Sequence, residues 1–144
     1  PFSSLDAIAY NFVNEDIPRL CVMVDAKRSH VYARFYANTS KASIKKEMVR
    51  RSLDELISVK ALVSRCQPQM GFCGDAWGLY HPQIEHKKDL FHILPESLWF
   101  PTPQSIALLT IEAYGKNMSK NCFELKAAYL YEQDCQVCSE NRGR

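Results

Sequence analysis

The sequence predicts an α/β domain in which a mixed β-sheet is flanked by helices. Residues 19–37 hold an unbroken apolar run, a short charged turn and an alternating run, the pattern of a β-hairpin. Beyond the hairpin, helical and strand patterns alternate along the chain, which favours strands covered by helices. A length of 144 residues, 47% hydrophobic and 24% charged, is ordinary for one domain with its own core.

The first predicted element is a helix over residues 3–13. Ser3 or Ser4 can cap it, and Asp6 lies in the first turn, where the helix dipole favours a carboxylate. Its apolar residues share one stripe, as expected of a helix packed on a core: Leu5, Ile8, Ala9 and Phe12.

The hairpin is expected to pair strand 19–26 antiparallel with strand 30–37. The first strand is apolar from Leu20 to Val24, which is typical of burial on both faces. Asp25 opens the turn. We expect it to shape that turn and pair with Lys27 or Arg28, because no catalytic partner lies in its own segment.

The sequence after the hairpin allows two interpretations. A third strand is predicted over residues 43–50, with a helix as the alternative because Lys and Glu are poor strand formers. Ser52 and Glu55 are three residues apart, which is the spacing of a capping box. This spacing predicts a helix over residues 53–64.

The remaining elements alternate in type. The patterns predict a strand at 68–73, a Gly74–Asp75 turn and a helical turn at 76–80. A polar loop at 81–89, a strand at 90–94 and an extended loop at 95–103 follow. The last predicted helix runs from Thr102 or Pro103 to about Tyr114, and Gly115 ends it. This order is that of a ribonuclease-H-like or actin-like half. Residues 1–131 form the expected domain, and 132–144 form a polar tail expected to be disordered.

The predicted core collects the inward positions of these elements. Ile106, Leu109 and either Thr110 or Ala113 are expected to point inward from the last helix. The core should contain Leu20, Val22, Val24, Val31, Ala33, Phe35, Leu56, Phe72 and Leu109.

Metal and redox sites find little support. Cys135-x-x-Cys138 has a suitable spacing, but no second pair accompanies it, and it lies in the polar tail rather than at a helix start. His81, His86 and His92 do not have the H-E-x-x-H spacing. The Gly74 turn is neither a P-loop nor a dinucleotide fingerprint. We therefore expect no metal and no cofactor.

The densest basic run could contact a phosphate backbone. It comprises Lys41, Lys45, Lys46, Arg50 and Arg51. No aromatic residue is interleaved to stack on bases, so such contacts would lack sequence preference. The alternative is a solvated strand edge, where lysines discourage sheet addition. The net charge of +2 is too small to decide between them.

Four places in this order resemble the C-terminal half of the TsaB family, also called YeaZ. Residues 4–9 look like its Ser-Leu-Glu-Ala-Leu-Ala helix, and residues 23–33 look like its strand and Asp-Ala-Arg hairpin. Residues 74–80 are similar to its Gly-Asp-Gly turn, and Pro103–Leu109 with Tyr129–Leu130 resemble its last helix and closing segment. The resemblance covers residues 3–131.

The chain also departs from that family. Ala76 replaces the second glycine of the turn, Ala127 or Ala128 stands where the closing proline is usual, and Tyr131 replaces an arginine. The glycine-rich N-terminal half of the family has no counterpart here. The start at Pro1 is expected of a fragment, a processed product or an excised piece.

The resemblance implies a non-catalytic scaffold or dimerisation subunit with an actin-like ATPase fold. Such proteins pair with the related catalytic subunit TsaD and the ATPase TsaE, and together they install threonylcarbamoyl on the adenosine beside the anticodon of certain tRNAs. A homodimer stays open, and tRNA is expected to be an indirect partner. The basic run supplies the candidates for a tRNA contact: Lys45, Lys46, Arg50 and Arg51.

Two alternatives stay open. One is a glycoprotease-like hydrolase, and the other is a small metal-binding module using Cys135 and Cys138. The cysteines do not form a disulfide scaffold, and no basic region followed by an apolar core begins the chain. We therefore expect a reduced, cytoplasmic protein without a membrane span.

Overall fold

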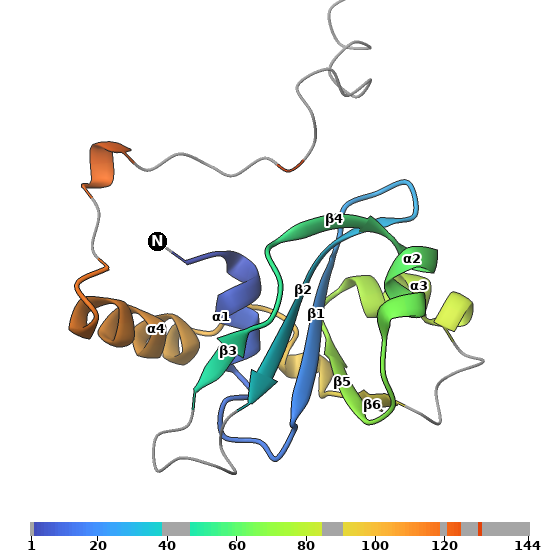
Figure 1. The fold of residues 1–144 in the computed structure, drawn as a ribbon, viewed down its shortest axis with the longest axis horizontal. Coiled ribbons are helices and arrows are strands. Elements are labelled where there is room, and N and C mark those ends of the chain that lie inside the picture. Colours follow the sequence, from blue (N-terminus) through green and yellow to red (C-terminus); the bar gives the residue numbers. More distant parts are fainter. Residues whose placement is uncertain (1, 39–46, 85–90, 119–120, 125–129, 131–144) are drawn as a thin grey trace, which may run out of the picture.

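A computed structural model of the chain describes residues 2–38, 47–84, 91–118, 121–124 and 130. Within these residues a six-stranded mixed sheet carries helices on both faces (Figure 1). The strands are β1 (Arg19–Asp25), β2 (His30–Asn38), β3 (Met48–Arg50), β4 (Glu55–Ser58), β5 (Met70–Cys73) and β6 (Phe91–Ile93). The α-helices are α1 (Ser4–Tyr10), α2 (Val59–Arg65), α3 (Ala76–Ile84) and α4 (Pro103–Gly115), and the 3-10 turns are η2 (Glu96–Leu98) and η3 (Cys122–Glu124). The predicted α/β class is confirmed.

Strand β1 lies in the middle of the sheet. It pairs antiparallel with β2, from Arg19 opposite Ala37 to Asp25 opposite Val31, which confirms the predicted hairpin. On its other side β1 pairs in parallel with β5, and β5 pairs in parallel with β6. A central strand buried on both faces explains why its sequence is apolar without alternation.

The edge of β2 that faces away from β1 pairs with two short strands, β3 and β4. β3 pairs with the end of β2, β4 pairs with its beginning, and residues 51–54 separate them. The predicted third strand is confirmed over Met48–Arg50, so the helix alternative is wrong there, and residues 43–46 lie outside the described chain.

The helix predicted over residues 53–64 is wrong in its first half. Residues 55–58 extend as β4, because the edge of β2 offers them backbone partners from His30 to Ala33. The helix starts only at Val59, where Ser58 is the N-cap and accepts from the Ala61 N–H at 3.3 Å. No capping box forms at Ser52, whose Oγ accepts from the Phe35 N–H at 3.2 Å and donates to the Leu53 carbonyl at 2.9 Å.

Helices α1 and α2 lie on opposite faces of the sheet. Tyr36 of β2 donates a hydrogen bond to Asp6 of α1, whereas Arg65 of α2 lies over the neighbouring Phe35 ring. Because successive side chains of a strand point to opposite faces, α1 and α2 must be separated by the sheet. Helix α4 packs on α1, and α3 contacts α2 and β1 (Figure 1).

The predicted core is confirmed at Leu20, Val22, Val31, Ala33, Phe72 and Leu109. Val24 and Phe35 are half-buried and pack against it. Leu56 is only half-buried because it belongs to the edge strand β4 rather than to a helix. Ile106 and Thr110 point outward, so the inward face of α4 is carried by Ser105 and Leu109.

Two further helix boundaries differ from the prediction. Helix α1 follows its Ser3 cap but ends at Tyr10 rather than Val13. Helix α3 continues through Pro82 to Ile84, into the predicted loop. The Gly78 carbonyl, which Pro82 cannot bond because it has no N–H, instead lies 3.2 Å from His81 Nδ1.

Glycine is required at the turn after β5 but not at the end of α4. Gly74 has a φ of 105°, and a Cβ there would lie 2.1 Å from the Met23 carbonyl oxygen, so the predicted tight strand-to-helix turn requires glycine. Gly115 is the last residue of α4 but not its left-handed stop. That conformation is taken by Asn117, whose φ is 52°.

Candidate functional site

The structure separates the two described members of the predicted tRNA-contacting set. Arg50 ends β3 and pairs with Asp6 of α1, whereas Arg51 lines a concavity on the α2 face together with Phe35 and Arg65. Lys45 and Lys46 lie outside the described residues, as does Lys41. Consecutive arginines therefore meet different surroundings on opposite faces of the sheet.

Arg50 is held by a buried carboxylate. The side chain of Asp6 is 2% exposed, and its two oxygens accept from Arg50 Nε at 2.9 Å and Nη2 at 2.5 Å. The same carboxylate accepts from Arg34 Nη1 at 2.8 Å, Tyr36 OH at 3.1 Å and the Ser3 N–H at 2.9 Å. These contacts fasten the start of α1 to β2 and β3.

The two carboxylates of this cluster, Asp6 and Asp54, are balanced by two guanidinium groups, those of Arg34 and Arg50. Burial by itself would raise the pKa of Asp6, but the hydrogen bonds from Arg50 and Ser3 and the charges of Arg50 and Arg34 hold it below its usual value. Arg34 Nε also lies 2.7 Å from Asp54 Oδ1, although no hydrogen bond is aligned between them. Burial raises the pKa of Asp54. This composition indicates a structural cluster rather than a catalytic acid.

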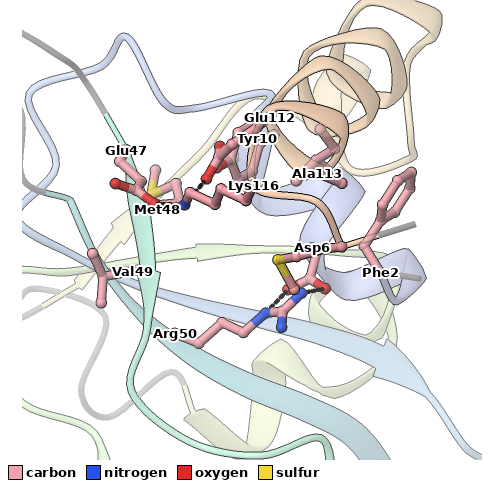
Figure 2. A pocket seen from close by; sticks show the side chains of 12 residues that line it. Phe2, Asp6, Tyr10, Glu47, Met48, Val49, Arg50, Glu112, Ala113 and Lys116 are labelled. Atoms are coloured by element: carbon pink, nitrogen blue, oxygen red, sulfur yellow. Dashed lines mark hydrogen bonds and ion pairs between the residues drawn. The ribbon is translucent and has the colours of Figure 1, made fainter. Parts of the chain in front are cut away.

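A pocket of about 320 Å³ opens beside this cluster, between α1, β3 and α4 (Figure 2). At its other end Tyr10 donates to Glu112, and Lys116 pairs with Glu112 and lies 2.6 Å from Glu47 Oε1. Burial and the Glu112 carboxylate raise the pKa of Tyr10 well above its usual value. At one end of this pocket Asp6 bonds Arg50, and at the other end Glu112 bonds Tyr10 and Lys116.

Arg51 belongs to a second concavity, of about 430 Å³, on the α2 face. Its cationic side chains come from three different parts of the fold: Arg19 begins β1, Arg51 follows β3, and Arg65 ends α2. The Arg65 guanidinium lies 5.0 Å from the centre of the Phe35 ring, which is a cation–π contact. We call the concavity formed by Arg19, Phe35, Arg51 and Arg65 the arginine pocket.

The backbone explains why Arg51 reaches this pocket. In the break between β3 and β4, the Arg51 N–H donates to the Phe35 carbonyl at 2.8 Å, and Ser52 Oγ accepts from the Phe35 N–H. Both backbone groups of Phe35 are thus bonded to the break rather than to a regular strand. The backbone of Arg51 is consequently held beside Phe35, and its side chain lines the same pocket as the Phe35 ring.

The other residues weighed from the sequence have structural roles. Asp25 accepts from Lys27 Nζ at 2.5 Å, the Lys27 N–H at 2.9 Å and Tyr80 OH at 3.0 Å, so the expected turn role is confirmed. Cys21 and Cys73 are buried free thiols, and burial raises the pKa of both. Neither thiol is poised as a nucleophile.

The metal hypothesis falls mainly on residues that the structure does not describe. Cys135, Cys138 and His86 lie outside them, and so does the predicted tail over 132–144. Where the chain is described, no group of three or more His, Cys, Asp or Glu side chains is placed to hold a metal ion. In the same residues no helix has the length and apolar character needed to cross a bilayer.

Helix α4 presents an apolar outer face. It packs on α1, and its Ser105 and Leu109 are buried, yet Ile111 and Tyr114 are 70% and 78% exposed. A helix that is apolar on both sides is typical of one covered from both sides. Exposed patches of this kind mark interaction surfaces.

Sequence reasoning missed the ionic clusters for a physical reason. An acidic residue in the first turn of a helix has a local explanation, so Asp6 carried no sign of its long-range partners. Glu112 and Lys116 do have the i,i+4 spacing of a helical ion pair, and that signal was available. Arg19 and Arg65 lie far from the basic run and come to Arg51 only through the fold.

Comparison with known proteins identifies the fold. No family model and no curated protein matches the chain by sequence. Two solved structures from Pseudomonas aeruginosa are similar: an uncharacterised protein with similarity to peptidase YeaZ, at 15% identity and a TM-score of 0.68, and YeaZ itself, at 16% identity and a TM-score of 0.64. The matches cover 90% and 89% of this chain but only 57% and 58% of the two structures. The chain therefore has a YeaZ-like fold, as predicted, and spans little more than half the length of these relatives.

Proposed function

We propose that this chain acts as a TsaB-like, non-catalytic subunit in the threonylcarbamoylation of tRNA. The observation that carries the proposal is the YeaZ-like fold over nine-tenths of the chain. In this proposal the chain assembles with a TsaD-like catalytic subunit and a TsaE-like ATPase. It works in the cytoplasm, where the thiols of Cys21 and Cys73 stay reduced.

The outer face of α4 supports an assembly role. Ile111 and Tyr114 are large, exposed and on one side of the helix, and burying such side chains against a partner is favourable by about 2 kcal/mol each. We propose that this face takes part in binding the TsaD-like subunit. A homodimer through the same face is the competing arrangement.

In this proposal tRNA is bound mainly through the assembled complex, and this chain adds an electrostatic contribution. Lys45, Lys46 and Arg51 are the basic residues that we keep in it, because Arg50 directs its donors to Asp6. Phosphate contacts made by cationic side chains position the RNA without reading its sequence.

A hydrolase is the second candidate, since one of the two similar structures is that of a protein with similarity to a peptidase. Its nucleophile would have to come from a Ser or Cys beside a base. The two described thiols that are fully buried do not meet this requirement. We therefore rank the scaffold role first.

Capture of the catalytic subunit tests the proposal. The tagged protein should retain a TsaD-like subunit, and Ile111→Asp should weaken that capture while leaving the thermal midpoint unchanged. Leu53→Asp is a matched control, because Leu53 is 80% exposed in the break between β3 and β4, away from α4. If the wild-type protein retains no such subunit, the proposed function is wrong. If Ile111→Asp and Leu53→Asp behave alike, α4 is not the contact surface.

A further inference from the structure

We propose that the arginine pocket binds the phosphodiester backbone of RNA, with Arg19 and Arg51 contacting phosphates and Arg65 offering a flat surface for a base. The choice of RNA among polyanions rests on the proposed function. The arrangement of side chains in the pocket stands on its own geometry.

The pocket gathers three guanidinium groups from separate elements into one concavity of about 430 Å³. Among the described residues, ion pairs account for Arg65 but not for Arg19 or Arg51, which are both exposed. Two cations are thus left to face the solvent over an apolar floor that includes Phe35 and Met70. A ligand with more than one negative group, spaced along a chain, complements this arrangement.

Arg65 differs from the other two because it is immobilised. Its Nη1 and Nη2 atoms bond the two oxygens of Glu55 at 2.5 Å and 3.1 Å, and its underside rests on the Phe35 ring. The side chain nevertheless stays 43% exposed. A planar guanidinium held in this way can stack on a base without losing further side-chain freedom.

Arginine rather than lysine at all three positions favours phosphate as the partner. The guanidinium fork donates two parallel hydrogen bonds to phosphate oxygens and is weakly hydrated, so it gives up water readily. This pocket also supplies what the basic run lacks in sequence, since Phe35 and Arg65 bring a stacking surface beside Arg51.

The test measures the affinity for an unmodified tRNA transcript by fluorescence anisotropy over a series of salt concentrations. The plot of log affinity against log salt should become shallower by about two units in Arg19→Gln/Arg51→Gln, one for each lost phosphate contact. Arg19→Lys/Arg51→Lys keeps both charges and should retain most of the wild-type slope.

The matched control is Arg28→Gln/Lys60→Gln, which removes the same charge from the far end of the hairpin and the start of α2. Its slope should change by less than about half a unit. Equal slopes for the pocket and control variants, both with wild-type thermal midpoints, would overturn the proposal. So would displacement of the tRNA by inorganic phosphate beyond that caused by chloride at the same ionic strength, because the pocket would then recognise a free phosphate.

The outcomes separate this inference from the proposed function. Arg19→Gln/Arg51→Gln should still capture the TsaD-like subunit. If the wild-type protein fails to capture that subunit but the slopes differ as expected, the proposed function falls and RNA binding by the pocket stands. If capture succeeds and the slopes are equal, only the arginine pocket proposal falls.

Discussion

Arg50 and Arg51 are neighbours in the chain, yet they have opposite roles in this account. Arg50 faces a carboxylate that is buried and accepts five hydrogen bonds, whereas Arg51 faces an aromatic ring and two more arginines. The difference teaches that two neighbouring basic residues at the end of a strand can lie on opposite faces of the sheet. Each member then acquires the role that its own face provides.

The energetic contrast follows from burial. A buried carboxylate deprived of its partners keeps its desolvation penalty, so the Asp6 cluster is expected to be costly to break. The exposed cations of the arginine pocket are hydrated and screened by salt, so their loss should scarcely affect folding. Substitutions in the Asp6 cluster on the α1 face should therefore lower the free energy of unfolding, whereas substitutions in the arginine pocket on the α2 face should hardly change it.

The largest effect is expected from Asp6→Ala. This change leaves Arg34 buried without its main partner and should lower the free energy of unfolding by about 3–5 kcal/mol. Urea denaturation followed by circular dichroism measures it. Glu15→Gln, at an exposed position just after α1, is the control and should change stability by less than about 0.5 kcal/mol. A loss below about 1 kcal/mol for Asp6→Ala would remove the contrast between the two faces.

A smaller loss is expected from Tyr36→Phe. It deletes only the hydroxyl that donates to Asp6 at 3.1 Å and keeps the buried ring. Hydrogen bonds to charged groups contribute about 1.5–3 kcal/mol, and the same urea titration should report a loss in this range. Tyr114→Phe removes a hydroxyl from a residue that is 78% exposed and should be neutral. Equal effects in the two variants would contradict the role of Tyr36.

Acid should weaken the same cluster in a defined direction. The folded-state pKa of Asp6 is lowered, so its stabilising contribution is complete above the unfolded value of about 3.9 and is lost as the pH falls through the folded value. The stability gap between wild type and Asp6→Asn should therefore narrow as the pH drops below about 4.

Asp54, whose pKa is raised, titrates in both proteins and should largely cancel in that difference. Urea denaturation of both proteins at a series of pH values provides the comparison. A gap that stays constant on acidification would show that the charge of Asp6 is not what stabilises the fold.

The smallest effect is expected on the α2 face. Glu55→Gln breaks the ion pair with Arg65, but the two side chains are 32% and 43% exposed, and such pairs contribute about 0–1 kcal/mol. The thermal midpoint should shift by a few degrees at most, in line with that energy. A loss as large as that of Asp6→Ala would mean that the arginine pocket is part of the structural framework.

Local patterns predicted most of the fold. The buried strand β1, its hairpin partner β2 and the capped start of α1 follow from periodicity and capping, which operate over a few residues. The region after β2 did not follow, because the edge of β2 recruits residues 55–58 as a strand and overrides a local capping signal. Propensity yields to tertiary pairing at such places.

The sequence predicted only some of the residues that form the candidate site. Arg51 stood out in a basic run, but Arg19 and Arg65 join it from segments 32 residues earlier and 14 residues later. Arg50 stood out in the same run, and its partner Asp6 is 44 residues away. Contacts between such distant positions depend on sheet order and register, which composition and spacing do not encode.

The most direct test compares Arg50→Gln with Arg51→Gln in the same two assays, urea denaturation and the salt dependence of tRNA binding. Arg50→Gln should lose about 1.5–3 kcal/mol of stability because it breaks charged hydrogen bonds to Asp6, and its salt slope should be that of the wild type. Arg51→Gln should keep its stability and have a slope shallower by about one unit. Two variants that change stability and slope to the same extent would contradict the division of these neighbouring arginines between folding and RNA binding.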